Sequence, residues 1–84
     1  SMNLLILDDE IYTVRALQKS VDWKAAGIDT VEIAFNTEKA REIVSQNQVD
    51  VLLTDIEMPR ESGLEFLEWM KEQGKEYKAM SCGI

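Results

Sequence analysis

Three aspartates stand where their carboxylates could bind a metal ion and attack a phosphoryl group. Asp8 and Asp9 directly follow an apolar run at residues 2–7, and Asp55 directly follows another at residues 49–54. An aspartate at the end of a rigid strand can act as a nucleophile toward phosphorus and form an acyl phosphate. An acid pair beside it suits Mg²⁺, a hard cation that prefers oxygen ligands. These residues therefore predict Mg²⁺-assisted phosphoryl transfer to Asp55.

The segment after Asp55 is expected to form a loop of fixed shape. It reads "IEMPRESG", so that Pro59 and Gly63 follow the aspartate within eight residues. Proline fixes its own φ angle, and glycine allows a tight turn into the next helix. We expect the loop to be prearranged for the site.

Hydrophobic patterning predicts the elements that position these residues. Apolar runs and period-two alternation indicate four strands, at residues 2–7, 30–35, 49–54 and 77–82. Apolar residues at helical spacing indicate three helices, at residues 11–21, 37–45 and 64–73.

Two details of the helices follow from the same patterns. Thr37 is placed to cap the second helix, because threonine is a favoured N-cap residue. The third helix offers one broad apolar face, made by Leu64, Leu67, Trp69 and Met70.

Strand–helix alternation predicts how the strands are arranged. It favours a parallel sheet with right-handed crossovers and helices on both faces. In the order 2-1-3-4, the strands that end at Asp9 and Asp55 are neighbours, and ligands bind beyond such strand ends. Three close carboxylates repel one another, and a divalent cation relieves that repulsion.

Composition excludes several classes of protein. The net charge of −7 over 84 residues argues against binding of nucleic acid by this segment, because gripping phosphates requires clustered Lys and Arg. With no histidine and only Cys82, an internal disulfide, a zinc site and a His-dependent triad are excluded. No apolar run is long enough to span a membrane, and no leader is evident. We expect one cytoplasmic domain without a membrane partner.

The motifs "LLILDDE", "LLTDIEMP" and "SGLEFLEWM" resemble the receiver domain of bacterial two-component response regulators. The resemblance implies a three-layer α/β fold of flavodoxin-like (CheY-like) type. It implies that Asp55 is the phosphoacceptor and that Mg²⁺ is held by Asp8, Asp9, Asp55 and the backbone carbonyl of Glu57. It also makes Ser81 the candidate hydroxyl residue at the end of the fourth strand.

The resemblance also implies partners. A sensor histidine kinase would phosphorylate Asp55, and the domain would control an output domain without being an enzyme itself. The stretch "DWKAAGI" resembles receivers that are joined to AraC-type DNA-binding domains, which implies a transcriptional output.

One departure from the family pattern concerns the end of the chain. Receivers have a fifth strand followed by a lysine that pairs with the phosphoryl group, and residues 1–84 offer no counterpart. The chain is therefore interpreted as a partial receiver, truncated before strand five. Apolar surface and a strand edge left open predict a homodimer or larger assembly that buries Trp69 and residues 77–84.

Two other functions remain open. A degenerate or truncated receiver would act only through protein contacts. A Mg²⁺-dependent phosphohydrolase would also use an aspartyl nucleophile, but its usual Asp-x-Asp signature is not provided by "DDE". The acids at residues 8–10 could also simply cap the first helix, and Glu61 and Glu65 are expected to be solvated.

Overall fold

The computed structural model describes residues 2–75 and 77–81, with only the backbone described at residues 79–81. The strands are β1 (Asn3–Leu7), β2 (Thr30–Ala34), β3 (Val51–Thr54) and β4 (Lys78–Ser81). The helices are α1 (Ile11–Ser20), α2 (Thr37–Gln46) and α3 (Gly63–Glu72). All strand pairs are parallel, and their order is β2-β1-β3-β4. The predicted fold class and strand order are confirmed.

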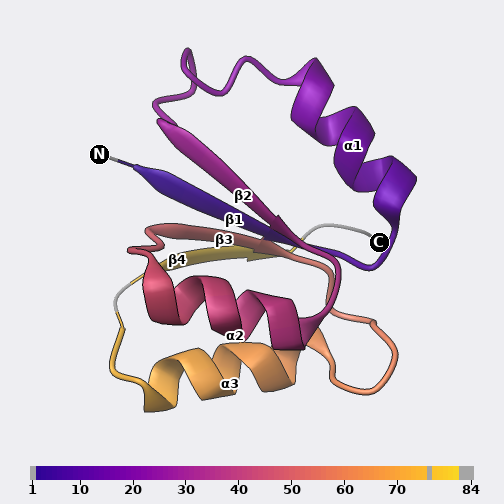
Figure 1. Ribbon diagram of the computed structural model, residues 1–84, viewed down its shortest axis with the longest axis vertical. Helices are drawn as coiled ribbons and strands as arrows, with labels where there is room; N and C mark the ends of the chain where they lie inside the picture. Colours follow the sequence, from indigo (N-terminus) through magenta and orange to yellow (C-terminus); the bar gives the residue numbers. More distant parts are fainter. Residues whose placement is uncertain (1, 76, 82–84) are drawn as a thin grey trace.

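The molecule has three layers, with α1 on one face of the sheet and α2 and α3 on the other (Figure 1). Successive residues of a strand point to opposite faces. Leu5 and Leu7 therefore join the core beneath α2 and α3, while Leu4 and Ile6 join the core beneath α1. This burial on both faces explains why β1 is continuously apolar instead of alternating.

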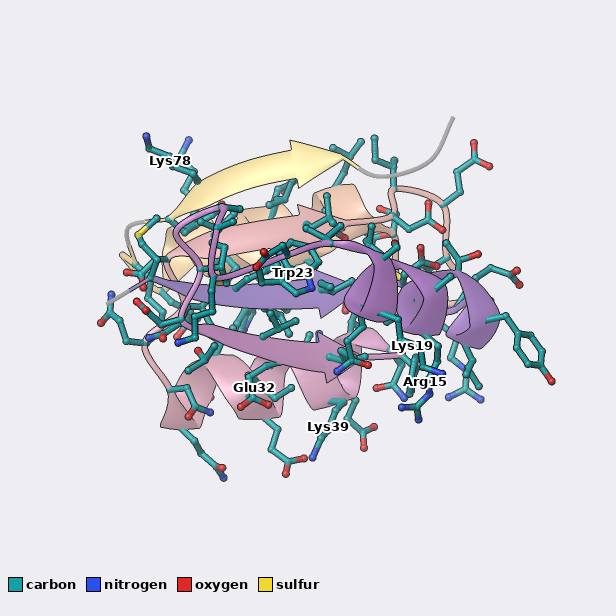
Figure 2. All side chains as sticks on the ribbon, turned by 90° about the horizontal axis from the view of Figure 1, so that it is seen from above. Arg15, Lys19, Trp23, Glu32, Lys39 and Lys78 are labelled. Atoms are coloured by element: carbon teal, nitrogen blue, oxygen red, sulfur yellow. The ribbon has the colours of Figure 1, made fainter. Side chains whose placement is uncertain are left out.

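The α1 side of the sheet is closed by the segment that follows the helix. Trp23 is partly buried against the cluster that contains Val14 and Ile28, and it lies over the sheet in Figure 2. Its indole N–H donates to the Gln18 carbonyl at 3.2 Å, which ties this segment back to α1. Across the described residues, no helix is both long enough and apolar enough to cross a lipid bilayer.

Register across the central strands sets the level at which the site begins. Leu7 of β1 stands opposite Thr54 of β3, so the next residue of each strand leaves the sheet at the same height. The Asp55 N–H donates to the Leu7 carbonyl at 2.9 Å, and the Asp8 N–H donates to the Ala34 carbonyl at 3.1 Å. These bonds extend the ladder just far enough to hold both aspartates.

The helix caps differ in part from those predicted. Asn36 is the N-cap of α2, and its side-chain oxygen accepts from the Lys39 N–H at 2.8 Å. Thr37 is the first helical residue, so the prediction that it caps α2 was wrong by one position. Helix α3 begins with a capping box between Ser62 and Glu65.

The buried face of α3 also differs from the prediction. Phe66 and Met70 are fully buried, whereas Leu64 is 54% exposed. Leu67 and Trp69 are only partly buried against the same core. The apolar face is therefore centred on Phe66, which the predicted face omitted.

Gly63 is required by a close approach and not by a tight turn. A Cβ at this position would lie 2.9 Å from Thr54 Oγ1 and closer still to the Asp55 carbonyl oxygen. The positive φ angle in this loop belongs to Arg60, at 71°. The first residue of α3 thus packs directly against the backbone of the candidate phosphoacceptor.

β2 and β4 are the two outer strands of the described sheet. Residues 82–84 of the predicted association surface lie outside the described residues, and self-association stays a prediction.

Replacing Gly63 by alanine should destabilise the fold by about 1–3 kcal/mol, because the new methyl group must displace main-chain atoms at Asp55. Urea unfolding measures the change. Gly74→Asn is the matched control: Gly74 has a φ of 68° with open space around it, and asparagine tolerates that conformation. The control should stay within about 0.5 kcal/mol of the wild type. A Gly63→Ala variant as stable as the control would contradict the close approach.

Candidate functional site

The predicted convergence of the three aspartates is found in the structure. One carboxylate oxygen from each of Asp8, Asp9 and Asp55 lies within 4.8 Å of the other two. They come from the carboxyl ends of the neighbouring strands β1 and β3. Side chains 46 or 47 positions apart therefore form one acidic cluster, as the strand order predicts.

Asp8 is the buried member of this acidic cluster, with only 6% of its surface exposed. Burial raises the pKa of its carboxyl group, and the negative charges of Asp55 and Asp9 raise it further. The Glu10 N–H donates to Asp8 Oδ1 at 2.9 Å, which acts in the opposite direction on the pKa. Asp8 is thus held in an environment that disfavours its charge.

The alternative that these acids simply cap α1 is not supported by the contacts. Glu10 occupies the N-cap position, but its side chain makes no capping hydrogen bond. Asp9 is exposed and contributes its carboxylate to the acidic cluster. Asp8 and Asp9 therefore belong to the acidic cluster, whereas Glu10 stands at the helix end without capping it through its side chain.

Asp55 is held in place by hydrogen bonds to its N–H, its carbonyl oxygen and its carboxylate. Its N–H is fixed to β1, and its carbonyl oxygen accepts from the Thr54 hydroxyl at 2.9 Å. Its side-chain Oδ1 accepts from the Glu57 N–H at 3.2 Å. This last bond curls the chain around the carboxylate. The predicted ligand role of the Glu57 carbonyl stays a prediction.

Ser81 pairs with Thr54 in the β3–β4 register, which places its backbone at the carboxyl end of β4. This is the same edge of the sheet that carries Asp55. The Ser81 side chain lies outside the described residues, and its candidate role stays a prediction.

The donor set of the acidic cluster fits a hard divalent cation. The cluster offers only carboxylate oxygen atoms as ligands. Beside burial, the negative charges of the two other carboxylates raise the pKa of the Asp8 carboxyl group. Mg²⁺ binds through one or two carboxylates and retains several waters, and an exposed Asp9 leaves room for them. The geometry therefore suits a cation that shares its shell with solvent or phosphate oxygens.

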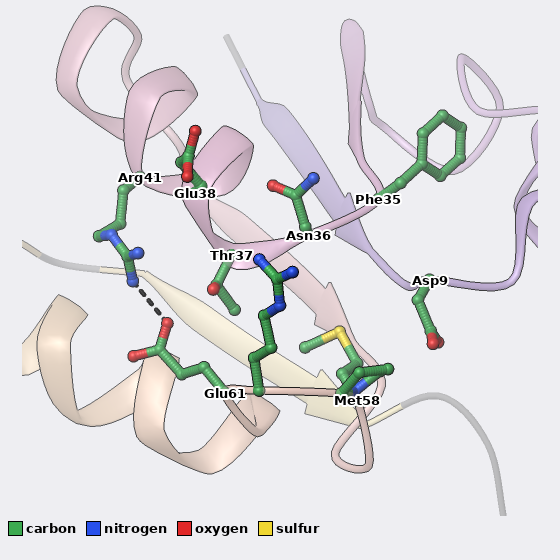
Figure 3. A pocket seen from close by; sticks show the side chains of 10 residues that line it. Asp9, Phe35, Asn36, Thr37, Glu38, Arg41, Met58 and Glu61 are labelled. Atoms are coloured by element: carbon green, nitrogen blue, oxygen red, sulfur yellow. Dashed lines mark hydrogen bonds and ion pairs between the residues drawn. The ribbon is translucent and has the colours of Figure 1, made fainter.

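A cavity of about 490 Å³ lies next to the acidic cluster, between α2 and the loop after β3 (Figure 3). Asp9 lines one side of it, and Met58 and Arg60 line the side formed by the loop. On its far side, Arg41 of α2 forms an ion pair with Glu61 of the loop.

Sequence reasoning missed this ion pair. Glu61 was expected to be solvated, but it is only partly exposed and contacts Arg41. The Thr37 side chain, followed by Arg41, holds the pKa of the Glu61 carboxyl group below its usual range by hydrogen bonding. The partners lie 20 positions apart on different elements, and no short motif signals such a pair.

Comparison with known proteins agrees with this geometry. Residues 4–83 match the family described as "Response regulator receiver domain". Over 69 residues, the chain is 30% identical to a response regulatory protein of Staphylococcus epidermidis, covering 82% of this chain and 28% of that protein. It is 36% identical over 67 residues to a protein-glutamate methylesterase/protein-glutamine glutaminase of Thiobacillus denitrificans, covering 80% of this chain and 18% of that protein.

A solved structure is similar in both sequence and fold. It is a two component transcriptional regulator AraC from Clostridium phytofermentans, with a TM-score of 0.83 and 34% identity. The match covers 96% of this chain and 64% of that one. The chain spans less than a third of the length of the two curated relatives, so their whole-protein activities do not follow from the match. The family match over almost all of its residues nevertheless shows that this chain belongs to the response regulator receiver domains.

Proposed function

We propose that this chain is a phosphoacceptor receiver domain, in which Asp55 takes a phosphoryl group from a sensor histidine kinase. The observation that carries the proposal is the acidic cluster, whose three carboxylates lie within 4.8 Å at one edge of the sheet. Membership of the receiver family supports it. The likeness to a transcriptional regulator supports an output domain that binds DNA in the cytoplasm.

The chain's residues divide the chemistry between them. An Asp55 carboxylate oxygen attacks phosphorus, the donor's P–N bond breaks, and an acyl phosphate forms. Asp8, Asp9 and Asp55, with the Glu57 carbonyl, would hold Mg²⁺. The cation would neutralise charge on the transferred group and orient it. Asp55 needs little movement, because its backbone is bonded to β1 and to the Thr54 hydroxyl.

Replacing Asp55 by asparagine should abolish phosphorylation, because an amide is not a nucleophile of this kind. Intact-mass spectrometry after treatment with acetyl phosphate and Mg²⁺ measures the covalent product. The matched control is Glu57→Ala, which should still be labelled because the proposed metal ligand at this position is a main-chain carbonyl. Label that persists on the Asp55→Asn variant would exclude Asp55 as the acceptor.

Two measurements separate the other functions. A receiver that acts only through protein contacts would show no specific Mg²⁺ binding in a titration followed by tryptophan fluorescence or calorimetry. A phosphohydrolase would release free phosphate continuously from phosphate monoesters. The intact set of three acids favours the phosphoacceptor over the contact-only receiver.

Replacing Asp8 by asparagine should make the metal-free protein more stable at pH 7. The folded-state pKa of Asp8 is raised, so its favourable contribution is complete below the unfolded-state pKa and is lost as pH rises through the folded-state value. Asparagine removes the charge but keeps the oxygen that accepts from the Glu10 N–H. Urea unfolding should show a gain of about 1 kcal/mol that shrinks as the pH falls, because protonation of wild-type Asp8 removes its unfavourable charge.

The same Asp8→Asn variant should lose at least about tenfold in Mg²⁺ affinity. Replacing a residue that only supports a metal ligand already lowers metal affinity about tenfold, and Asp8 is itself a proposed ligand. Asp9→Asn is the matched control, since Asp9 is exposed: it should also weaken Mg²⁺ binding but raise metal-free stability less than Asp8→Asn does, because the charge of Asp9 is the smallest of the causes that raise the pKa of Asp8. Equal or lower stability of Asp8→Asn at pH 7 would contradict the assigned electrostatics.

A further inference from the structure

The loop at residues 56–62 is closed by hydrogen bonds within its own part of the chain. The Gly63 N–H donates to the Ile56 carbonyl at 2.9 Å and brings the two ends of the loop together. The Glu61 N–H donates to the Pro59 carbonyl at 2.8 Å and makes an inner turn. These bonds define the shape of the loop. Its position relative to α2 depends on side chains.

One ion pair joins this loop to α2. Arg41 Nη1 lies 2.5 Å from Glu61 Oε1, and Figure 3 shows the two side chains meeting across the space between helix and loop. The Thr37 side chain of α2 also hydrogen-bonds the Glu61 carboxylate, so Glu61 is the loop residue that contacts α2 in both interactions. The Arg41 and Glu61 side chains are 35% and 26% exposed, against 54% and 56% in the Lys39–Glu42 pair on the same helix.

The surroundings of Glu61 favour its charged form. It faces the first turn of α2, where the helix dipole stabilises an anion, and the Thr37 side chain and Arg41 both lower the pKa of its carboxyl group. Three other charged groups line the same cavity: Asp9, Glu38 and Arg60. Arg41 is the cation that contacts Glu61 directly.

We propose that Arg41 and Glu61 are positioning residues for the metal centre. By holding the loop against α2, they fix the Glu57 carbonyl relative to the acidic cluster. This inference rests on the proposed function, in which that carbonyl is a ligand of Mg²⁺. Glu57 lies four residues before Glu61 in the same loop, and its N–H is already bonded to Asp55 Oδ1.

The chemistry of the cation makes loop position important. Mg²⁺ demands nearly ideal octahedral geometry, so a carbonyl that can drift contributes less to binding than one held in place. Groups beyond the direct ligands commonly change metal affinity by an order of magnitude when they are removed. Neither Arg41 nor Glu61 belongs to the acidic cluster, so an effect of either on Mg²⁺ binding would pass through the loop.

The test uses Glu61→Gln, Arg41→Gln, their double variant and the charge swap Arg41→Glu/Glu61→Arg. Glu42→Gln is the matched control, because it breaks an exposed ion pair on the same helix. Amide hydrogen exchange at Glu57 and Glu61, measured by NMR without metal, reports how firmly the loop is held. The shift of the Glu57 amide on addition of Mg²⁺ gives the affinity.

Each single variant should exchange severalfold faster at these two amides and bind Mg²⁺ about threefold to tenfold more weakly. The double variant should be no worse than either single variant, because both remove the same interaction. The charge swap should recover much of the loss, and Glu42→Gln should behave as wild type.

Three results would overturn the inference. Exchange and affinity equal to those of Glu42→Gln would show that the pair does not hold the loop. Faster exchange with unchanged affinity would show that the loop's position does not matter to the cation. Opposite effects of the two single variants on Mg²⁺ affinity, with unchanged exchange, would indicate a long-range charge effect. Absence of Mg²⁺ binding in the wild type would instead refute the proposed metal centre, and the metal-free exchange would still decide whether the pair holds the loop.

Discussion

The repulsion among three carboxylates at one edge of the sheet is the constraint on which the rest of the structure depends. Left to themselves, Asp8, Asp9 and Asp55 would move apart in water. They are held within 4.8 Å because β1 and β3 are paired in register and both strands are locked into cores on their two faces. The free energy released by burying these strands therefore maintains a concentration of charge that is itself unfavourable. Under the proposed function, bound Mg²⁺ would relieve this repulsion.

The parts around the acidic cluster serve the same constraint. The loop after β3 turns back on itself so that the Glu57 N–H reaches the Asp55 carboxylate, and the ion pair at Glu61 connects that loop to α2. Under the proposed function, the end of β3 would supply the nucleophile, and the loop would supply main-chain groups around it.

Most of the fold and the acidic cluster could be predicted from the sequence, because both depend on regular patterns. The strands and helices follow from periodicity, and the meeting of Asp9 and Asp55 follows from the strand order. The failures are of another kind. Asn36 and Thr37 are both favoured N-cap residue types, so the sequence pattern does not decide which of them caps α2. The Arg41–Glu61 pair depends on how a loop settles against a helix, and that information is not local in sequence.

Gly63 has a mechanical consequence. It is the first residue of α3, and its bare Cα touches the backbone of Asp55 with no side chain between them. A side chain at a contact can usually accommodate a small displacement by changing its rotamer. Gly63 has no side chain, so this contact cannot adjust in that way. A shift of the Asp55 backbone by a fraction of an ångström would therefore move the first residue of α3. Because α3 is a ten-residue helix, that displacement would be carried along its length to its other end.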